Sequence, residues 1–194
     1  MTERAQTEVK MRSTNHVVSS TAYTTGGDFC RIFSENMKDL YLLGWLLTGD
    51  AEKAEQCFVS GLGDCIKGNA VFKEWAQSWA RRTVIQNAIQ IMSPVENETG
   101  IQQAIPVRVD LLVTRADIQS ELEAIVKLQP LERFVFVMSV LEGYSYQDCS
   151  ILLGCSRQQI VSARERALEH LANGAESSMV SSRDARFAAA PLSN

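Results

Sequence analysis

The chain lacks any apolar run long enough to cross a bilayer. A membrane-spanning helix needs roughly 20 consecutive apolar residues, and the sequence contains no such stretch. The first residues, MTERAQTEVKMRSTN, are polar and contain no apolar core of a secretion signal. We therefore expect a cytoplasmic protein without a membrane partner.

Prolines, glycines and aromatic residues are scarce. The 194 residues include 4 Pro and 11 Gly, and aromatics make up 7% of the chain. This composition favours helices over a β-sandwich. With 45% hydrophobic and 22% charged residues, the chain is too apolar to be wholly disordered and long enough for one ordinary domain or two small ones. We expect an all-α protein.

Metal ligands and catalytic groups are also few. The two histidines, His16 and His170, are far apart, and no two cysteines form a CxxC pair. The five cysteines are irregularly spaced: Cys30, Cys57, Cys65, Cys149 and Cys155. A zinc site usually needs about four clustered ligands, so we expect buried, reduced thiols and no metal. Without a glycine-rich phosphate loop or a nucleophile–base pair, we expect no catalytic residue, no cofactor and no enzymatic activity.

Excess basic charge is missing as well. The net charge of −4 argues against a protein that coats nucleic acid non-specifically, because that affinity comes from many Lys and Arg contacts to phosphate. Charge is nevertheless segregated: residues 35–65 carry six acids and two bases, whereas 67–90 carry four bases and one acid. These stretches are either solvated helix faces, or an acidic surface for a protein and a basic one for phosphate.

Two helical blocks, 29–92 and 111–172, lie between polar segments. Residues 1–28 and 173–194 show no sustained period, so we expect a flexible N-terminal arm and a flexible C-terminal tail. The proline-containing stretch 93–110 lacks a helical stripe and is interpreted as a linker. The chain is thus predicted to form two small helical domains joined by a linker.

Apolar residues in the first block recur at helical spacing. One expected helix face consists of Phe33, Met37, Leu40, Gly44 and Leu47. Gly49 is expected to end this helix and Asp50 to cap the next one. A further helix is expected over 72–92, with Trp75 and Trp79 either in the core or on a DNA-binding face.

The second block ends in two predicted helices joined by a glycine turn. Ser145 with Asp148 and Ser156 with Gln159 resemble capping boxes, and Gly154 between them suits a tight turn. The inner stripe of the last helix consists of Ile160, Ala163, Ala167 and Leu171. The outer face consists of Arg157, Gln158, Ser162, Glu165, Arg166 and Glu169. This pattern is typical of a DNA-binding helix-turn-helix. An ordinary helical hairpin with a polar outer face is the alternative.

A longer motif surrounds these two helices. It reads L-x-P-x-x-R, then G-x-S, a leucine pair before glycine, a helix-starting serine and R-A-x-x-x-L. Its residues are Leu128, Pro130, Arg133, Gly143, Ser145, Leu152, Leu153, Gly154, Ser156, Arg166, Ala167 and Leu171. Residues 128–171 therefore resemble region 4 of the sigma-70 family of RNA polymerase factors.

The first block carries a fainter pattern. A helix-Gly-Asp-helix arrangement is formed by Leu40, Leu47, Gly49, Asp50, Ala54 and Glu55. An F-x-x-W…A-R arrangement is formed by Phe72, Trp75, Ala80 and Arg81. Both resemble region 2 of the same family, and the two-block layout is similar to that of its small extracytoplasmic-function group.

The resemblance implies a factor that directs the RNA polymerase core to promoter DNA. In this family region 2 binds the β′ clamp and melts DNA, while region 4 binds the β flap and reads the minus-thirty-five element. By position, polymerase binding falls to Asp50, Glu52 and Glu55. Promoter melting falls to Trp79, Arg81 and Arg82, and recognition to Arg157, Gln158, Gln159, Ser162 and Arg166. An anti-sigma protein is a further partner to be considered.

Five positions depart from the family pattern. Gln56 stands where an acid is usual and Val59 where a glutamine is usual, and both Val161 and Ala163 stand where many relatives carry a base. Glu165 would repel a nearby phosphate. A second interpretation therefore stays open, a sigma-like regulator that binds DNA or polymerase without supporting initiation. A third is a protein-interaction module that uses the hairpin as a scaffold.

Overall fold

The computed structural model describes residues 22–95 and 116–188, and it describes side chains over 22–95 and 119–174. Most of the expected arm and linker lie outside these ranges, as do residues 189–194. The described residues form helices and one isolated bridge between Tyr23 and Phe72. The expected all-α class is confirmed. In the described part of the chain, no helix is both long and apolar enough to cross a membrane.

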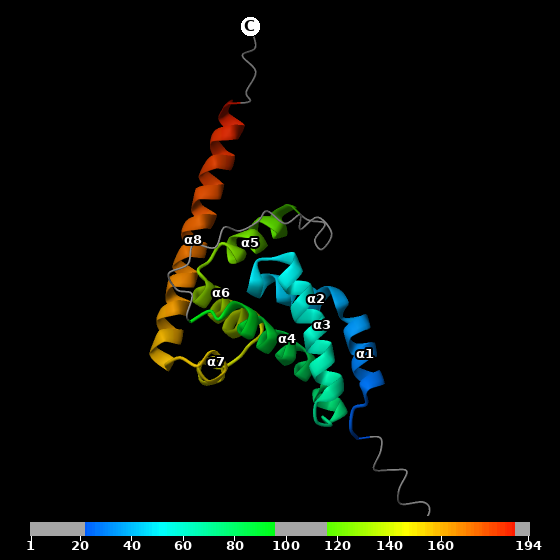
Figure 1. Ribbon diagram of the computed structural model, residues 1–194. Coiled ribbons are helices and arrows are strands. Elements are labelled where there is room, and N and C mark those ends of the chain that lie inside the picture. Colours follow the sequence, from blue (N-terminus) through cyan, green and yellow to red (C-terminus); the bar gives the residue numbers. More distant parts are fainter. Residues whose placement is uncertain (1–21, 96–115, 189–194) are drawn as a thin grey trace, which may run out of the picture.

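The N-terminal block contains four α-helices and one short 3-10 turn (Figure 1). Their bounds are α1 Gly26–Glu35, α2 Met37–Thr48, α3 Ala51–Lys67, η2 Lys73–Trp75 and α4 Ala76–Met92. Thr25 and Asp28 cap α1 reciprocally, so this helix starts inside the segment 1–28 that was expected to be an arm.

The first expected helix face is divided between two helices. Asn36 separates α1 from α2, and its amide Nδ2 donates a hydrogen bond to the carbonyl of Ile32. Phe33, Leu40 and Leu47 are buried as expected, but Met37 at the break is exposed. At the other end of α2, Gly49 adopts a left-handed conformation and the Asp50 side chain accepts from the Lys53 amide, as predicted.

The core interpretation of Trp75 and Trp79 is wrong. Their side chains are 57% and 37% exposed. Trp75 lies in η2, outside the regular helix, so an α-helical period that includes it predicts the wrong face. The inner face of α4 is formed instead by Ala80, Val84, Ile85, Ala88 and Met92.

The C-terminal block contains four α-helices and a π-helical turn. Their bounds are α5 Ala116–Val126, α6 Pro130–Phe136, η4 Val137–Leu141, α7 Tyr146–Leu153 and α8 Arg157–Ala188. Pro130 opens α6 as expected. Helix α8 continues well past residue 172, where a tail was expected, and residues 173–188 contain no proline that would stop it (Figure 1).

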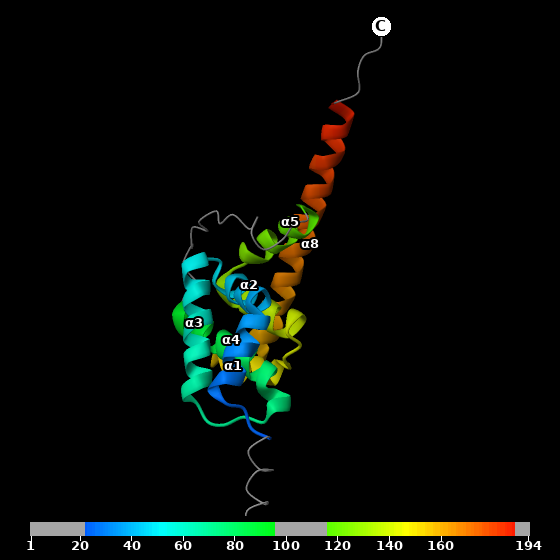
Figure 2. The same ribbon diagram turned by 90° about the vertical axis from the view of Figure 1, so that its right-hand side faces the viewer.

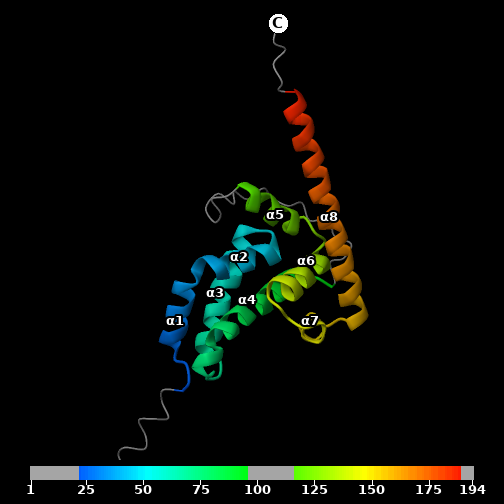
Figure 3. The same ribbon diagram turned by 180° about the vertical axis from the view of Figure 1, so that it is seen from behind.

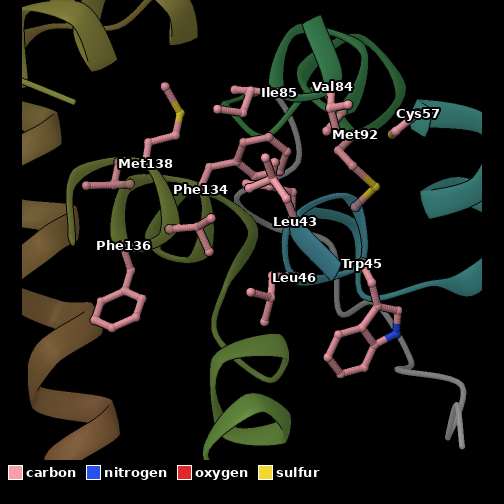
Figure 4. Packing of buried hydrophobic residues seen from close by; sticks show 14 of the residues in the cluster. Leu43, Trp45, Leu46, Cys57, Val84, Ile85, Met92, Phe134, Phe136 and Met138 are labelled. Carbon is pink, nitrogen blue, oxygen red and sulfur yellow. The ribbon is translucent and has the colours of Figure 1, made fainter. Parts of the chain in front are cut away.

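One apolar cluster runs through both blocks. Helix α2 contacts both α5 and α6, and in Figure 4 the ring of Phe134 points toward Leu43 and Ile85 of the N-terminal block. Figure 2 shows α3 and α8 on opposite sides of the molecule. Seen from behind (Figure 3), α7 lies between the N-terminal block and the first turns of α8.

Candidate nucleic-acid interface

Helices α7 and α8 are joined by a three-residue turn whose geometry follows from its sequence. The Ser145 side chain accepts from the Asp148 amide and caps α7. Gly154 ends α7 with φ of 68°, a left-handed conformation that favours glycine. At the start of α8, the Ser156 amide donates to Gln159 Oε1 and the Gln159 amide donates to Ser156 Oγ. Both expected N-caps are thus present, and the reciprocal bonds of a capping box are formed by Ser156 and Gln159.

Helix α8 has one buried side and one exposed side in its first turns. Ile160, Ala163 and Ala167 are fully buried, whereas Arg157, Gln158 and Gln159 are exposed. The exposed side borders an open groove of about 580 Å³ against the start of α6. The groove is lined by Gln129, Leu131, Glu132, Ser156, Gln158, Gln159, Ser162 and Arg166. Four of the predicted recognition residues, Gln158, Gln159, Ser162 and Arg166, thus line one accessible groove. Arg157 borders a separate pocket beside Tyr146.

Two arginines of α8 are engaged within the protein. Arg166 Nε donates to Glu132 Oε1 at 2.9 Å, and His170 Nδ1 lies 3.0 Å from Glu132 Oε2. Because the Glu132 side chain is almost fully buried, Arg166 compensates a charge that water cannot reach. The guanidinium of Arg164 lies over the Tyr146 ring. Arg157 is left as the exposed cation at the start of the helix.

Residues 118–171 match the family model described as sigma-70, region 4. Over these residues the chain is similar to sigma-70 region 4, and residues 118–171 are called the region 4 domain below. The resemblance of the second block is therefore confirmed, and the helix-turn-helix of α7 and α8 lies within the region 4 domain. Sigma-70 factors are transcription factors rather than enzymes, and they bind RNA polymerase and promoter DNA.

Two further comparisons used the whole chain and are less informative about the family. No curated protein matches this sequence. Among solved structures, the chain is similar to the sigma factor RpoE in its co-crystal structure with the anti-sigma factor NepR from Bartonella quintana. The two chains are 19% identical, the TM-score is 0.49, and the match covers 77% of this chain and 97% of that chain.

The predicted melting residues lie on α4, which faces the region 4 domain. Arg81 Nε donates to Glu142 Oε2 at 2.6 Å, and Arg81 Nη2 donates to Glu142 Oε1. This hydrogen bonding holds the pKa of Arg81 above its usual value. Trp79 and Arg82 line a groove of about 800 Å³ between α4 and the turn at Glu142 and Tyr144. The structure thus brings these three predicted residues together at the boundary between the blocks.

The predicted polymerase-binding residues lie on α3. Glu52 and Glu55 are exposed, together with Gln56 and with Val59, whose side chain is 60% exposed. The side chain of Asp50 is occupied by its cap of α3. Glu52 and Glu55 therefore form an accessible acidic face, with an apolar residue next to it.

Several residues that shape these surfaces were not singled out from the sequence. Glu132 and Glu142 each neutralise an arginine that was predicted to contact DNA. Arg133 was matched to the family motif without a role. In the structure it is buried and bonds to main-chain oxygens of α2 and α5. Except for the local bond from Arg133 to Val126, each of these contacts joins residues that are 34 to 86 positions apart. No rule of sequence spacing predicts contacts of that range.

The cysteines give no sign of a metal centre. Within the residues described, no three His, Cys, Asp or Glu side chains are grouped as metal ligands. Cys57, Cys65 and Cys149 are buried, and desolvation raises the pKa of the Cys57 and Cys149 thiols to about 11. These three residues pack in the core as neutral thiols.

Proposed function

We propose that the protein is a transcription initiation factor of the sigma type, which directs the RNA polymerase core to promoters. One observation carries this proposal: the family match falls on a helix-turn-helix whose last helix buries its apolar stripe and exposes Arg157, Gln158 and Gln159. Arginine and glutamine side chains bind base edges and phosphates in the major groove.

The contacts of α8 divide into two roles in this proposal. Arg157, Gln158 and Ser162 approach the duplex directly, and Gln159 fixes the start of the helix through its cap. Arg166 neutralises Glu132 and reaches DNA only with the side of its guanidinium that faces the groove. With Glu165 exposed on the same helix, the net positive charge of this face is small. Binding to polymerase therefore supplies the local concentration that DNA affinity alone does not.

The two other predicted surfaces complete the proposal. The acidic face of α3, with Glu52 and Glu55, binds the β′ clamp through charge complementarity. Trp79, Arg81 and Arg82 of α4 contact melted promoter DNA by stacking and by binding phosphate. The β flap is the expected partner of the region 4 domain, and an anti-sigma partner stays a prediction.

A second candidate is a sigma-like regulator that binds DNA or polymerase without supporting initiation. The specific observation in its favour is the composition of the α3 face. Gln56 is exposed where the family usually has an acid, and Val59 is exposed where it usually has a glutamine, so one carboxylate of that surface is missing. A charge-complementary interface that lacks one carboxylate is weaker.

A reconstituted transcription assay separates the two candidates. The full chain is added to RNA polymerase core on a pool of genomic promoter fragments from the same source, and the transcripts are sequenced. Initiation at defined start sites that depends on the protein supports the sigma factor. Recovery of the protein on polymerase or DNA without such transcripts supports the regulator. An Arg157→Ala, Gln158→Ala double variant should lose start-site selection, whereas Glu169→Ala on the same helix should retain it.

A further inference from the structure

The basic face of α4 already has an anionic occupant, which comes from the region 4 domain. Glu142 forms two hydrogen bonds with Arg81 in a side-on arrangement. A guanidinium binds the two anionic oxygens of a phosphate diester in the same side-on way, with two parallel hydrogen bonds. The Glu142 side chain is 8% exposed and that of Arg81 is 32% exposed. The carboxylate is therefore largely shielded from solvent, whereas the guanidinium is partly exposed.

The local structure of η4 places Glu142 against α4. The Glu142 amide donates to the carbonyl of Val137, five residues earlier, and the Tyr144 amide donates to Met138. This widened turn adds one residue to the helical path, and Gly143 follows with φ of 73°. An ordinary α-helical turn would aim position 142 elsewhere. The backbone of this turn thus sets the direction in which the Glu142 side chain leaves the main chain.

A second acid, Asp148, adds negative charge to the groove beside α4. Asp148 lines the same groove as Arg81, Arg82 and Trp79, together with Tyr144. The region 4 domain is kept in place by Arg133, whose guanidinium is buried against the end of α2. The residues predicted to bind melted DNA therefore face two carboxylates on a docked domain.

We propose that the Glu142 carboxylate is an internal substitute for a DNA phosphate, which occupies Arg81 in the isolated protein and must leave before α4 binds DNA. This inference rests on the proposed role of Arg81 and Arg82 in DNA binding. With competition of this kind, the apparent affinity for DNA equals the intrinsic affinity multiplied by the fraction of molecules in which Arg81 is available. According to this proposal, α4 binds DNA only after the turn that follows η4 has moved away from Arg81.

Binding of fluorescein-labelled oligo(dT) to the full chain at low salt tests the proposal. Glu142→Gln keeps the shape of the side chain and removes its charge, so we expect about three- to tenfold tighter binding than for the unmodified protein. Asp148→Asn is the matched control, because it removes an equal charge from the same groove without touching Arg81. It should change the affinity by less than about twofold. In an Arg81→Ala background, Glu142→Gln should have no effect.

The outcomes separate this inference from the proposed function. If Glu142→Gln and Asp148→Asn tighten DNA binding equally, or if Glu142→Gln still tightens it in the Arg81→Ala protein, Glu142 is not a substitute for phosphate. In that case the effect of Arg82→Ala on binding still tests whether α4 binds DNA. If neither Arg81→Ala nor Arg82→Ala weakens binding in the Glu142→Gln protein, the DNA-binding role of α4 fails and the inference fails with it.

A second measurement needs no variant. Hydrogen–deuterium exchange of the unmodified protein is followed over residues 137–148 with and without oligo(dT). Departure of Glu142 should loosen the turn, so the Glu142 and Tyr144 amides should exchange faster when DNA is bound. Exchange that stays the same or slows in this segment on DNA binding overturns the proposal.

Discussion

Arg133 Nε donates a hydrogen bond of 3.0 Å to the carbonyl of Leu47, 86 residues earlier in the chain. The same guanidinium donates to the carbonyls of Thr48 and Val126. The last carbonyls of a helix have no partner within it, and the negative end of its dipole favours a cation. Arg133 of the region 4 domain thus caps α2 of the N-terminal block, and burial lowers its pKa to about 10.

Replacing Arg133 by methionine should destabilise the protein by about 2–3 kcal/mol, because the carbonyls of Leu47 and Val126 lose a buried donor. The measurement is the free energy of unfolding in urea. Arg31→Met is the control, since Arg31 is exposed and pairs with Asp28 one turn away on the same helix. Equal stability of the two variants would contradict a capping role for Arg133.

Gly49→Ala should destabilise the protein by about 1–3 kcal/mol. Gly49 has φ of 68°, and an added Cβ would lie 2.9 Å from Val126 Cγ1 and 3.2 Å from Arg133 Nη1. The control is Gly63→Ala in α3, where a Cβ meets no atom within 4 Å and alanine favours the helix. Thermal denaturation compares the two variants, and a loss at both positions would refute the steric argument.

Arg157→Ala should weaken binding to duplex DNA and reduce the salt slope of log K by about 0.9, as expected for one lost phosphate contact. Fluorescence anisotropy over a series of salt concentrations measures both quantities. Glu165→Gln should act in the opposite direction, because it removes an exposed acid from the same helix. An unchanged slope for Arg157→Ala would show that α8 binds in another orientation. Arg166→Ala is unsuitable here, because it strands the buried Glu132.

Glu55→Lys should reduce the recovery of RNA polymerase core on the immobilised protein by about threefold or more, because it reverses a charge on the acidic face of α3. Glu169→Lys makes the same change on α8, on the opposite side of the molecule (Figure 2). Quantitative blotting of the polymerase subunits measures recovery. Equal loss for both variants would indicate a general charge effect rather than a binding surface on α3.

Local sequence signals predicted the helix-turn-helix well. Ser156 with Gln159, the left-handed Gly154 and the buried Ile160, Ala163 and Ala167 all lie where the pattern placed them. These features depend on neighbours within one or two helical turns, which a single sequence displays. The family motif covers the same residues, so two kinds of signal agreed in this part of the chain.

Long-range ionic contacts could not be predicted in the same way. Nothing near Arg81 or Arg166 in the sequence indicates that Glu142 and Glu132 neutralise them, because Glu142 lies in the turn after η4 and Glu132 lies on α6. The position of Trp75 was misjudged for a related reason, since a 3-10 turn shifts the register before α4 begins. Such features depend on how the helices pack against one another, and the periodicity of a single helix carries no information about that packing.

Raising the pH should destabilise the native protein through its buried thiols. Burial raises the pKa of the Cys149 thiol to about 11 in the folded chain, against an ordinary value of 9.0. Between these values the unfolded chain loses the thiol proton while the folded chain keeps it, so the free energy of unfolding falls as the pH rises. Urea denaturation at pH 8 and pH 10 should show a smaller loss for Cys149→Ala than for the unmodified protein. The exposed Cys30 provides the control, because Cys30→Ala should lose as much stability as the unmodified protein. Parallel losses in all three proteins would mean that the Cys149 thiolate is not desolvated in the fold.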